Sequence, residues 1–525
     1  MRANPGSASI RKHPPHHPSA GVRSLLGWMS ISLLLVALLI PLRSALAQEV
    51  AGEIVSVLGT VEVLREGRWQ TAGVGATLAV GETVKTGADG RLALQLANGS
   101  QLKLNANSHL ELKQIVAEDD PTPAATGFPR NILRLIGGEA WIRGNGEDLE
   151  VQSVPATATI RGTEFNLAVE RADGARLAVL EGLVEFANAR GSVRVAAGEG
   201  ATAKAGEAPR KSVLLDPLDA VQWSLYYPDL TGDRTGRTRA GWGGPRARRW
   251  TEAARDHLRR GEVPEARRAL DRALALDPAD ARAHGLRAVI ALVQNRKSEA
   301  RAAAERAVAA DPGAPEAHLA LSWVQQAEFD LDGALASARR AVALAPDDPQ
   351  ALIQASRLLF GMGRTEEAAA LAERARARAP DDAVVRSTQG FLHLARGRTS
   401  AAVTAFEEAI AQDSTLGEPH LGLGIALFKR DRTEEAVEEI RKATLLEPKV
   451  SLYNSYLGKA YYETKDDRLA EKYLAEAERL DPRDPTPHFY DAIREQSVNR
   501  PVEAVQDLQT AIALNDNRAV YRSQL

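Results

Sequence analysis

The strongest constraint on the fold is a pattern of alanines that recurs every 34 residues through the second half of the chain. When the sequence is aligned from residue 247 with this period, alanine fills the twentieth and the twenty-seventh positions of all eight copies. The alanines at the twentieth position are Ala266, Ala300, Ala334, Ala368, Ala402, Ala436, Ala470 and Ala504. A period of this length indicates a solenoid, in which each unit buries its apolar face only against its neighbours.

Other positions of the repeated unit predict a pair of helices. The eighth position is always alanine, serine or glycine, which lets two helices approach closely. The fifteenth position is usually glycine, asparagine or aspartate, residues that tolerate the left-handed conformation at a helix end, and proline at the thirty-second position stops the second helix in six copies. This spacing resembles the tetratricopeptide repeat. The resemblance implies an all-α right-handed solenoid over residues 247–518, and residues 519–525 would begin a ninth unit or form a truncated cap.

The resemblance also implies a concave groove lined mainly by the first helix of each pair. The groove residues it assigns here are Trp323, Arg357, Phe360, Phe391, Phe428, Lys459, Tyr462 and Phe489. An apolar and aromatic groove with a few cations suits an extended or helical segment of another protein. The alternative is that several of these rings pack against the next helix.

The first half of the chain has the alternating pattern of β-strands. The stretch "RLALQLANGSQLKL" alternates leucines with polar residues on both sides of Asn98-Gly99, which predicts a hairpin. Similar segments continue to Ala205 and predict an all-β domain of roughly ten or more short strands over residues 50–205. Residues 118–129 interrupt the pattern and are predicted to form an exposed loop.

Three segments of this half, "LANGSQLKLNANSHLEL", "VQSVPATATIRGTEFNLAV" and "LEGLVEF", resemble the FecR-type domain. The resemblance implies a domain that senses or docks, as found in exported proteins and in periplasmic parts of iron-dicitrate signalling regulators. Its most specific piece is "IRGTEF", Ile160 to Phe165. Arg161, Gly162, Thr163 and Glu164 form either a recognition surface or a tight turn with a local ion pair.

The first 47 residues have the features of a signal peptide. Basic residues precede an apolar run from Leu25 to Leu42, and Ala45 and Ala47 are small residues that a signal peptidase accepts. We predict cleavage between Ala47 and Gln48. The alternative is an uncleaved signal anchor, because the apolar run approaches the length that spans a bilayer. Both readings place the rest of the chain in the periplasm or cell envelope of a bacterium.

Residues 206–246 separate the two halves. Asp216 can cap a short helix that begins at Pro217, and the apolar face of that helix is expected to dock on the β-domain or on the first repeat. The following glycine-rich and arginine-rich stretch predicts a flexible linker.

The sequence offers little that supports catalysis or nucleic-acid binding. The formal net charge is −3, which gives no basic footprint for nucleic acid, and the chain has no cysteine. Of the ten histidines, only His109 lies outside the leader and the repeats, and no second ligand stands beside it at metal spacing. No phosphate loop, nucleophile elbow or zinc-protease motif is present. We therefore predict no enzyme, no catalytic residue, no metal site and no cofactor.

Together these features predict an exported cell-envelope adaptor or scaffold that binds protein or peptide segments of other envelope proteins through its groove. It would contact the membrane only through an uncleaved N-terminal anchor. Two alternatives remain: a periplasmic component of a FecR-type transmembrane signalling system, and an activator of an envelope-remodelling enzyme. The signalling role would also need a cytoplasmic sigma-binding domain, and only some 24 residues precede Leu25.

Overall fold

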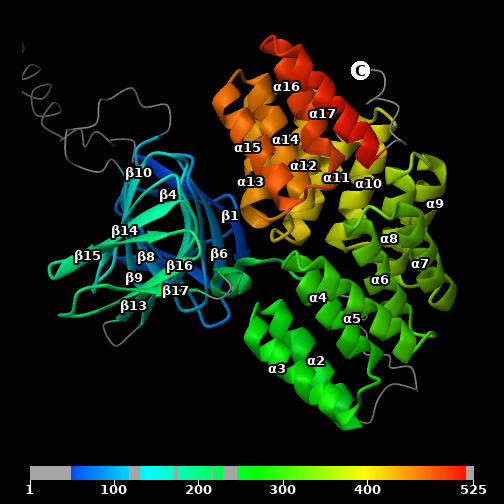
Figure 1. Ribbon diagram of the computed structural model, residues 1–525, viewed down its shortest axis with the longest axis horizontal. Coiled ribbons are helices and arrows are strands. Elements are labelled where there is room, and N and C mark those ends of the chain that lie inside the picture. The colour runs from blue at the N-terminus through cyan, green and yellow to red at the C-terminus, as the bar shows by residue number, and fades with distance from the viewer. Residues whose placement is uncertain (1–48, 118–130, 171–173, 215–216, 229–244, 516–525) are drawn as a thin grey trace, which may run out of the picture. The chain divides into compact units, whose positions relative to one another are not determined.

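The computed structural model describes residues 49–117, 131–170, 174–214, 217–228 and 245–515 (Figure 1). The described residues from Val50 onward belong to one compact unit. The predicted signal segment, its cleavage position between Ala47 and Gln48, the predicted exposed loop at 118–129 and the predicted ninth unit or cap at 519–525 lie outside the described residues. None of the helices in the described ranges is long and apolar enough to cross a bilayer.

Residues 50–214, hereafter the β-domain, consist of strands that surround one apolar core. The strands are β1 (Val50–Leu58), β2 (Val61–Arg65), β3 (Arg68–Thr71), β4 (Thr77–Ala79), β5 (Thr83–Thr86), β6 (Arg91–Leu96), β7 (Gln101–Leu104), β8 (His109–Gln114), β9 (Asn131–Arg143), β10 (Asp148–Gln152), β11 (Thr157–Arg161), β12 (Glu164–Glu170), β13 (Gly174–Glu181), β14 (Leu183–Asn188), β15 (Gly191–Ala196), β16 (Glu199–Lys204) and β17 (Arg210–Val213). The predicted hairpin is confirmed, because β6 pairs antiparallel with β7 and Gly99 adopts a positive φ of 81°.

Strand β9 joins the two groups of strands in this domain. Its first part pairs with β8 and β10, and its second part pairs with β7 and β12. The change of partners falls at Gly137 and Gly138, and Gly138 has a φ of 88°. A β-carbon at Gly138 would lie 2.4 Å from the backbone of Ser108, so this close approach requires glycine.

The β-domain extends past the predicted end at Ala205. Strand β17 pairs antiparallel with β16 through Arg210 to Val213, and its four side chains are all exposed. An exposed edge strand needs no apolar alternation, which explains why the pattern did not reveal it. The following segment forms a 3-10 helix, η1 (Pro217–Ser224).

The second half of the chain consists of eight antiparallel helix pairs, as the 34-residue period predicts. The helices are α2 (Pro245–Arg259), α3 (Val263–Leu276), α4 (Ala281–Val293), α5 (Lys297–Ala310), α6 (Pro315–Ala327), α7 (Leu331–Leu344), α8 (Pro349–Gly361), α9 (Thr365–Arg378), α10 (Ala383–Ala395), α11 (Thr399–Gln412), α12 (Gly417–Phe428), α13 (Thr433–Leu446), α14 (Ser451–Glu463), α15 (Asp467–Leu480), α16 (Pro485–Ser497) and α17 (Pro501–Leu514). The recurrent alanines are buried where helices meet.

Side-chain volumes at two positions of the repeat are matched in the second to seventh repeats, whereas the first and eighth combine leucine at the twenty-fourth position with alanine at the eighth. Where the twenty-fourth position is alanine, as in the second to fourth repeats, the eighth position carries alanine or serine. Where the twenty-fourth position is Phe406, Ile440 or Leu474, the eighth position is glycine. A β-carbon at Gly390 would lie 2.5 Å from the Phe406 ring. The small residues of the pattern therefore compensate for specific large neighbours.

The turn between the two helices of each pair needs a left-handed residue. All eight residues at the fifteenth position have positive φ, namely Gly261, Asn295, Phe329, Gly363, Gly397, Asp431, Lys465 and Asn499. Phe329 and Lys465 adopt this conformation although their side chains disfavour it. In the seventh repeat the turn is closed by backbone hydrogen bonds from Lys465 to Tyr462 and from Asp466 to Tyr461.

We expect Lys465→Gly to raise the free energy of unfolding by about 0.5–1 kcal/mol, because glycine removes the strain of the left-handed β-carbon but adds chain entropy to the unfolded state. Lys465 is exposed, and its ammonium lies 5.6 Å from the centre of the Tyr462 ring. Lys465→Ala is the matched control, since it removes this cation contact and keeps the β-carbon. Urea unfolding followed by circular dichroism tests the prediction, which is wrong if glycine is no more stable than alanine.

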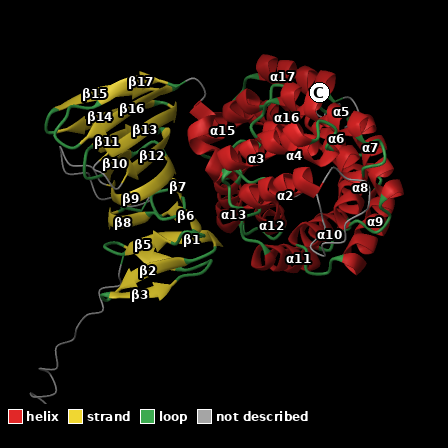
Figure 2. Ribbon diagram, turned by 90° about the horizontal axis from the view of Figure 1, so that it is seen from below, coloured by secondary structure: helices red, strands yellow, loops and turns green. Residues whose placement is uncertain are grey.

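The helix pairs follow a turn that closes on itself (Figure 2). Asn295 donates a hydrogen bond of 2.8 Å to the carbonyl oxygen of Leu480, and Lys297 forms an ion pair of 2.8 Å with Asp481. Arg483 donates to the carbonyl oxygen of Glu328 at 2.8 Å. We call these contacts between the second or third repeat and the seventh the seam. The seam brings the second and third repeats against the seventh, so the concave face of the array surrounds a space that remains open to solvent.

Candidate protein-binding site

The concave face of the array surrounds a cavity of about 1920 Å³. Its wall combines apolar, aromatic and charged side chains from most of the repeats, and strand β1 contributes Ser56, Val57 and Leu58. The volume exceeds the about 300–1,000 Å³ of ordinary small-molecule pockets. The size and the mixed wall suit a polypeptide segment better than a small ligand.

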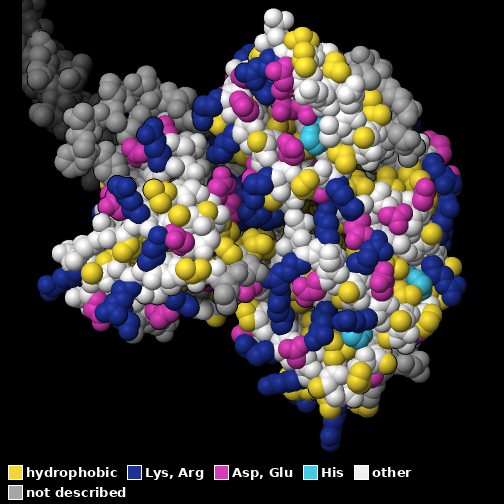
Figure 3. Space-filling model, in the orientation of Figure 1, with side chains coloured by type: hydrophobic (Ala, Val, Ile, Leu, Met, Phe, Trp, Pro, Cys, Tyr) yellow, Lys and Arg dark blue, Asp and Glu magenta, His cyan; other side chains and the backbone are white. Residues whose placement is uncertain are grey.

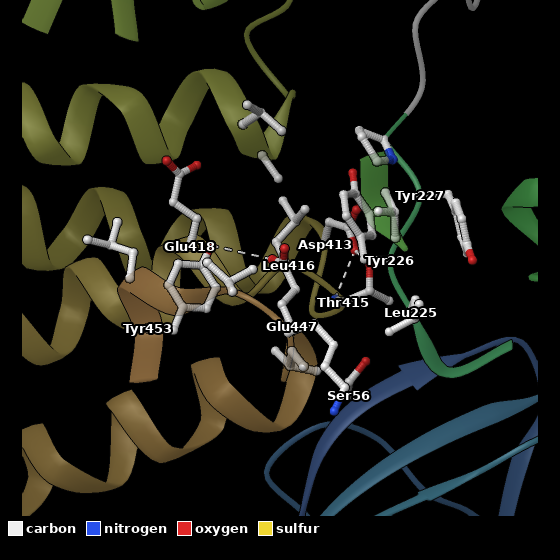
Figure 4. A pocket seen from close by; sticks show the side chains of 18 of the residues that line it. Ser56, Leu225, Tyr226, Tyr227, Asp413, Thr415, Leu416, Glu418, Glu447 and Tyr453 are labelled. Atoms are coloured by element: carbon white, nitrogen blue, oxygen red, sulfur yellow. Dashed lines mark hydrogen bonds between the residues drawn. The ribbon is translucent and has the colours of Figure 1, made fainter. Parts of the chain in front are cut away.

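Part of this space is occupied by the chain itself. The segment from Leu225 to Pro228, hereafter the inner segment, follows η1 and lines the cavity beside Asp413, Thr415 and Leu416 (Figure 4). Leu225 and Tyr227 are 9% and 7% exposed, and both belong to the buried apolar cluster of the first repeats. The amide of Gln294 donates a hydrogen bond of 3.4 Å to the Tyr227 hydroxyl.

Paired charges line the cavity near the inner segment. Arg357 donates to a Glu418 carboxylate oxygen at 2.7 Å, and the Glu418 charge raises the pKa of Arg357 above its ordinary value, against the opposing effect of burial. Burial raises the pKa of the nearby Glu447 carboxyl, which accepts a hydrogen bond of 2.9 Å from the backbone of Gly417. Burial and these two carboxylates also raise the pKa of the Tyr453 hydroxyl. In this part of the wall, Arg357 and Glu418 therefore neutralise each other's charge.

The β-domain docks on the array beside the cavity. Trp141 of β9 and Trp223 of η1 share a buried apolar cluster with Leu445 and Leu446 at the end of α13. The short helix η1 thus packs on the β-domain, and Leu225 directly after it packs with the first repeats.

A buried ion pair lies at the centre of this contact. The carboxylate of Glu164 is 1% exposed and lies 2.8 Å from Arg143 and 3.0 Å from Lys449, and the indole of Trp141 donates to it at 3.1 Å. Gly162 adopts a positive φ of 65°. The "IRGTEF" stretch is thus a tight turn with an ion pair, and one of the two cations comes from the repeat array.

Lys103 of β7 makes a second polar link across the same contact. Its ammonium donates to the carbonyl oxygen of Ser224 at 2.6 Å and to that of Leu446 at 2.8 Å. Burial lowers the pKa of Lys103 to about 7. One side chain thereby joins the β-domain, η1 and α13.

The predicted groove residues have two different environments. Trp323 and Arg357 line the cavity, and Trp323 also packs against the apolar cluster of the first repeats. Phe391 packs edge to face on Phe406 with 5.0 Å between ring centres, and the Lys459 ammonium lies 4.8 Å from the centre of the Phe428 ring. The remaining three, Phe360, Tyr462 and Phe489, are partly buried against apolar clusters between helices. Binding by any of these residues stays a prediction.

Sequence reasoning missed several residues of the site. In the sequence, the inner segment is recognisable only as apolar residues near a linker. Glu418, Glu447 and Tyr453 belong to no motif that would mark them as site residues. Their approach depends on how far the array turns, which the period alone does not specify.

Three carboxylates, of Asp491, Glu495 and Asp507, lie close enough to hold a metal ion, with oxygens within 4.8 Å of one another. Arg494 already pairs with Asp491 at 2.6 Å. Burial and the neighbouring carboxylates raise the pKa of Glu495 to about 7, so proton uptake can relieve the repulsion between them. This acidic cluster therefore needs no bound ion to be stable.

Family models match both halves of the chain. A model described as FecR protein matches residues 82–185. Two models described as tetratricopeptide repeat match residues 251–315 and 291–349, and residues 325–390 and 393–455. The chain carries a FecR-type domain followed by tetratricopeptide repeats. Tetratricopeptide repeats generally bind protein partners, and the FecR-type domain is typically found in membrane-associated proteins.

Solved structures match parts of the chain at low identity. The APC/C hetero-tetramer Cut9-Hcn1 is 17% identical with a TM-score of 0.41, over 53% of this chain and 54% of that chain, so the match spans about half of its length. The human IFIT1 dimer with PPP-AAAA is 17% identical with a TM-score of 0.41, over 53% and 72% of the two chains. A putative anti-sigma factor from Parabacteroides distasonis is 19% identical with a TM-score of 0.23, over 28% and 68%. No curated protein matches the sequence.

The two kinds of domain are of non-catalytic, scaffold or regulatory type. Their combination suggests a protein-interaction scaffold with a FecR-like domain.

Proposed function

We propose that the protein is an exported cell-envelope scaffold that binds an extended segment of another protein inside the turn of repeats. The observation that carries the proposal is the cavity of about 1920 Å³, which has Trp323 and Arg357 on its wall. An aromatic and a guanidinium side chain are the residue types that most often dominate protein interfaces. On the face drawn in Figure 3, acidic and basic side chains are interspersed over the array. This mixture favours recognition of a specific partner over non-specific electrostatic attraction, which needs a surface of mainly one charge.

Export is supported by the sequence of the first 47 residues, where basic residues, an apolar run and the pair Ala45 and Ala47 follow one another. The bound partner would then be another protein of the periplasm or cell envelope. The FecR-like domain, docked on the sixth repeat through Glu164 and Lys103, would sense or dock on a further component of the same assembly.

A photo-cross-linking amino acid at Gln350 tests the proposal in cells. Gln350 is half-buried and lines the cavity, whereas Arg268 is exposed on α3 and does not. We expect the label at Gln350 to trap a discrete envelope protein and the label at Arg268 to trap none. Adding Trp323→Ala should weaken the adduct about tenfold, the effect of losing one anchor side chain.

The proposal is wrong if positions 350 and 268 are labelled alike, or if Trp323→Ala leaves the adduct unchanged while circular dichroism shows a folded array. Cell fractionation of the same strain tests export, because a protein that stays in the cytoplasmic fraction contradicts an envelope role.

A further inference from the structure

The inner segment lies in the cavity as an extended bound segment would. Leu225 and Tyr227 belong to the apolar cluster of the first repeats, whereas the intervening Tyr226 packs with Ala383 and Leu416 of the fifth repeat. Alternate side chains of an extended chain point to opposite sides. Three consecutive residues thus contact two walls, one formed by the first repeats and one by the fifth.

The wall around the inner segment is adapted to its side chains. Tyr227 is 7% exposed, and its hydroxyl accepts the hydrogen bond from Gln294, an amide that is itself 3% exposed. Ala383 and Leu416, on the Tyr226 side, are also buried. Aromatic rings with a polar tip are favoured anchors in such mixed surroundings.

The inner segment fills only part of the space inside the array. The volume of about 1920 Å³ remains with Leu225 to Pro228 in place, and it continues along Trp323, Gln326 and Gln350. A longer ligand could therefore begin where the inner segment lies and extend along the wall.

We infer that the wall around the inner segment is a recognition site for an extended segment of another protein whose sequence is leucine, two aromatic residues and proline. The chain's own Leu225 to Pro228 occupies this site as a tethered ligand, and a partner's segment binds by displacing it. The inference deepens the proposed scaffold function and rests on it for the identity of the partner as a protein. It assigns the partner a short motif and adds an internal competitor to the binding reaction.

The tether makes the competition strong without strong contacts. The inner segment directly follows η1, whose Val221 and Trp223 are buried, so it competes from within the same chain at an effective concentration of about the millimolar range. A free segment of equal intrinsic affinity therefore binds about tenfold to a hundredfold more weakly than it would to the vacated site. The seam restricts entry as well, although it contains exposed or half-buried polar contacts such as Asn295 with Leu480 and Lys297 with Asp481. Such contacts break at low cost.

The test uses a fluorescent synthetic peptide with the sequence of residues 222–228, QWSLYYP, and the full chain from Gln48. Fluorescence anisotropy measures its binding to the parent and to a variant that carries Tyr226→Ser and Tyr227→Ser. We expect the variant to bind the peptide at least about tenfold more tightly, because the internal competitor is weakened. The same peptide with both tyrosines replaced by serine should not bind.

Tyr456→Ser is the matched control variant, since Tyr456 is a partly buried tyrosine of α14 that packs on Tyr490 and does not line the cavity. It should bind the peptide no better than the parent. If the double variant fails to fold, the single variant Tyr226→Ser replaces it in the test, because it leaves Leu225 and Tyr227 in place. We expect this variant to bind the peptide about threefold more tightly than the parent does. The inference is overturned if the folded variants bind the peptide no better than the parent or the control.

These outcomes are separate from those of the proposed function. Peptide binding by the opened variant without any cross-linked envelope protein would support the recognition site and contradict the scaffold role. If an envelope protein is cross-linked equally well to the parent and to the Tyr226→Ser, Tyr227→Ser variant, the scaffold role is supported. The inner segment would then only pack against the array and would not compete with the partner.

Discussion

Replacement of Glu164 by glutamine should lower the free energy of unfolding by about 3–5 kcal/mol, the range found when one partner of a buried ion pair is removed. Glu164 is the anion shared by Arg143, which is largely buried, and Lys449. Glutamine preserves the shape and leaves both cations without a counter-charge. Urea unfolding followed by circular dichroism measures the loss. Glu185→Gln on the exposed side of β14 is the matched control and should change stability by less than about 0.5 kcal/mol.

The same variant should alter the pH dependence of stability. Burial alone would raise the pKa of Glu164, but Lys449 and Arg143 hold it well below the ordinary value of 4.5. A carboxyl with a lowered folded-state pKa stabilises the protein fully above its unfolded-state pKa, and this stabilisation is lost as the pH falls below it. The parent should therefore lose stability steeply below about pH 4.5, and Glu164→Gln should lose less over that interval. Parallel pH curves for the two proteins would contradict this role of Glu164.

The helical half could be predicted almost completely, because residues close together in the sequence specify each helix pair. Ala266 and its seven equivalents recur at a fixed spacing, and each is buried in the contact that the spacing predicts. The left-handed turn at Asn295 or Gly363 was also readable, since those residue types favour it. Phe329 and Lys465 adopt the same conformation against their preference, so the surrounding helix pair, and not the residue, determines the turn.

The contacts that build the site could not be predicted, because they join residues far apart in the chain. Glu164 and Lys449 are 285 positions apart, and neither is marked by a motif that names the other. The seam between Lys297 and Asp481 depends on the pitch of the whole array, which small rotations in every repeat determine together. The position of Tyr226 between two walls follows from both of these features.

The predicted groove residues illustrate the same limit. Trp323 and Arg357 occupy the ninth position of their repeats and line the cavity, whereas Phe391 occupies the same position and packs on Phe406. Phe406 is the bulky residue of its repeat, so it fills space that alanine leaves open elsewhere. The orientation of a ring therefore depends on its neighbour in the adjacent helix as much as on its place in the period.

Phe406 lies between two helices that approach closely only because both present glycine to it. Its ring is fully buried, and β-carbons added at Gly390 of α10 and at Gly422 of α12 would lie 2.5 Å and 2.3 Å from it. We expect Phe406→Ala to lower the free energy of unfolding by about 3–5 kcal/mol, through lost burial and the cavity it leaves. Gly390→Ala alone should lower it by about 1–3 kcal/mol, because overpacking outweighs the better helix propensity of alanine.

The double variant distinguishes volume matching from independent effects. With Phe406 replaced by alanine, the fifth repeat has the small pair found in the second repeat, Ala288 with Ala304, so alanine at position 390 no longer meets a ring. Gly390→Ala should then stabilise the Phe406→Ala protein by about 1 kcal/mol, the gain in helix propensity. Urea unfolding of the four proteins gives the coupling free energy, which should favour the double variant by at least about 2 kcal/mol over the sum of the single changes. If the stability changes of the two single variants simply add in the double variant, glycine is required at position 390 by the backbone conformation and not by the Phe406 ring that faces it.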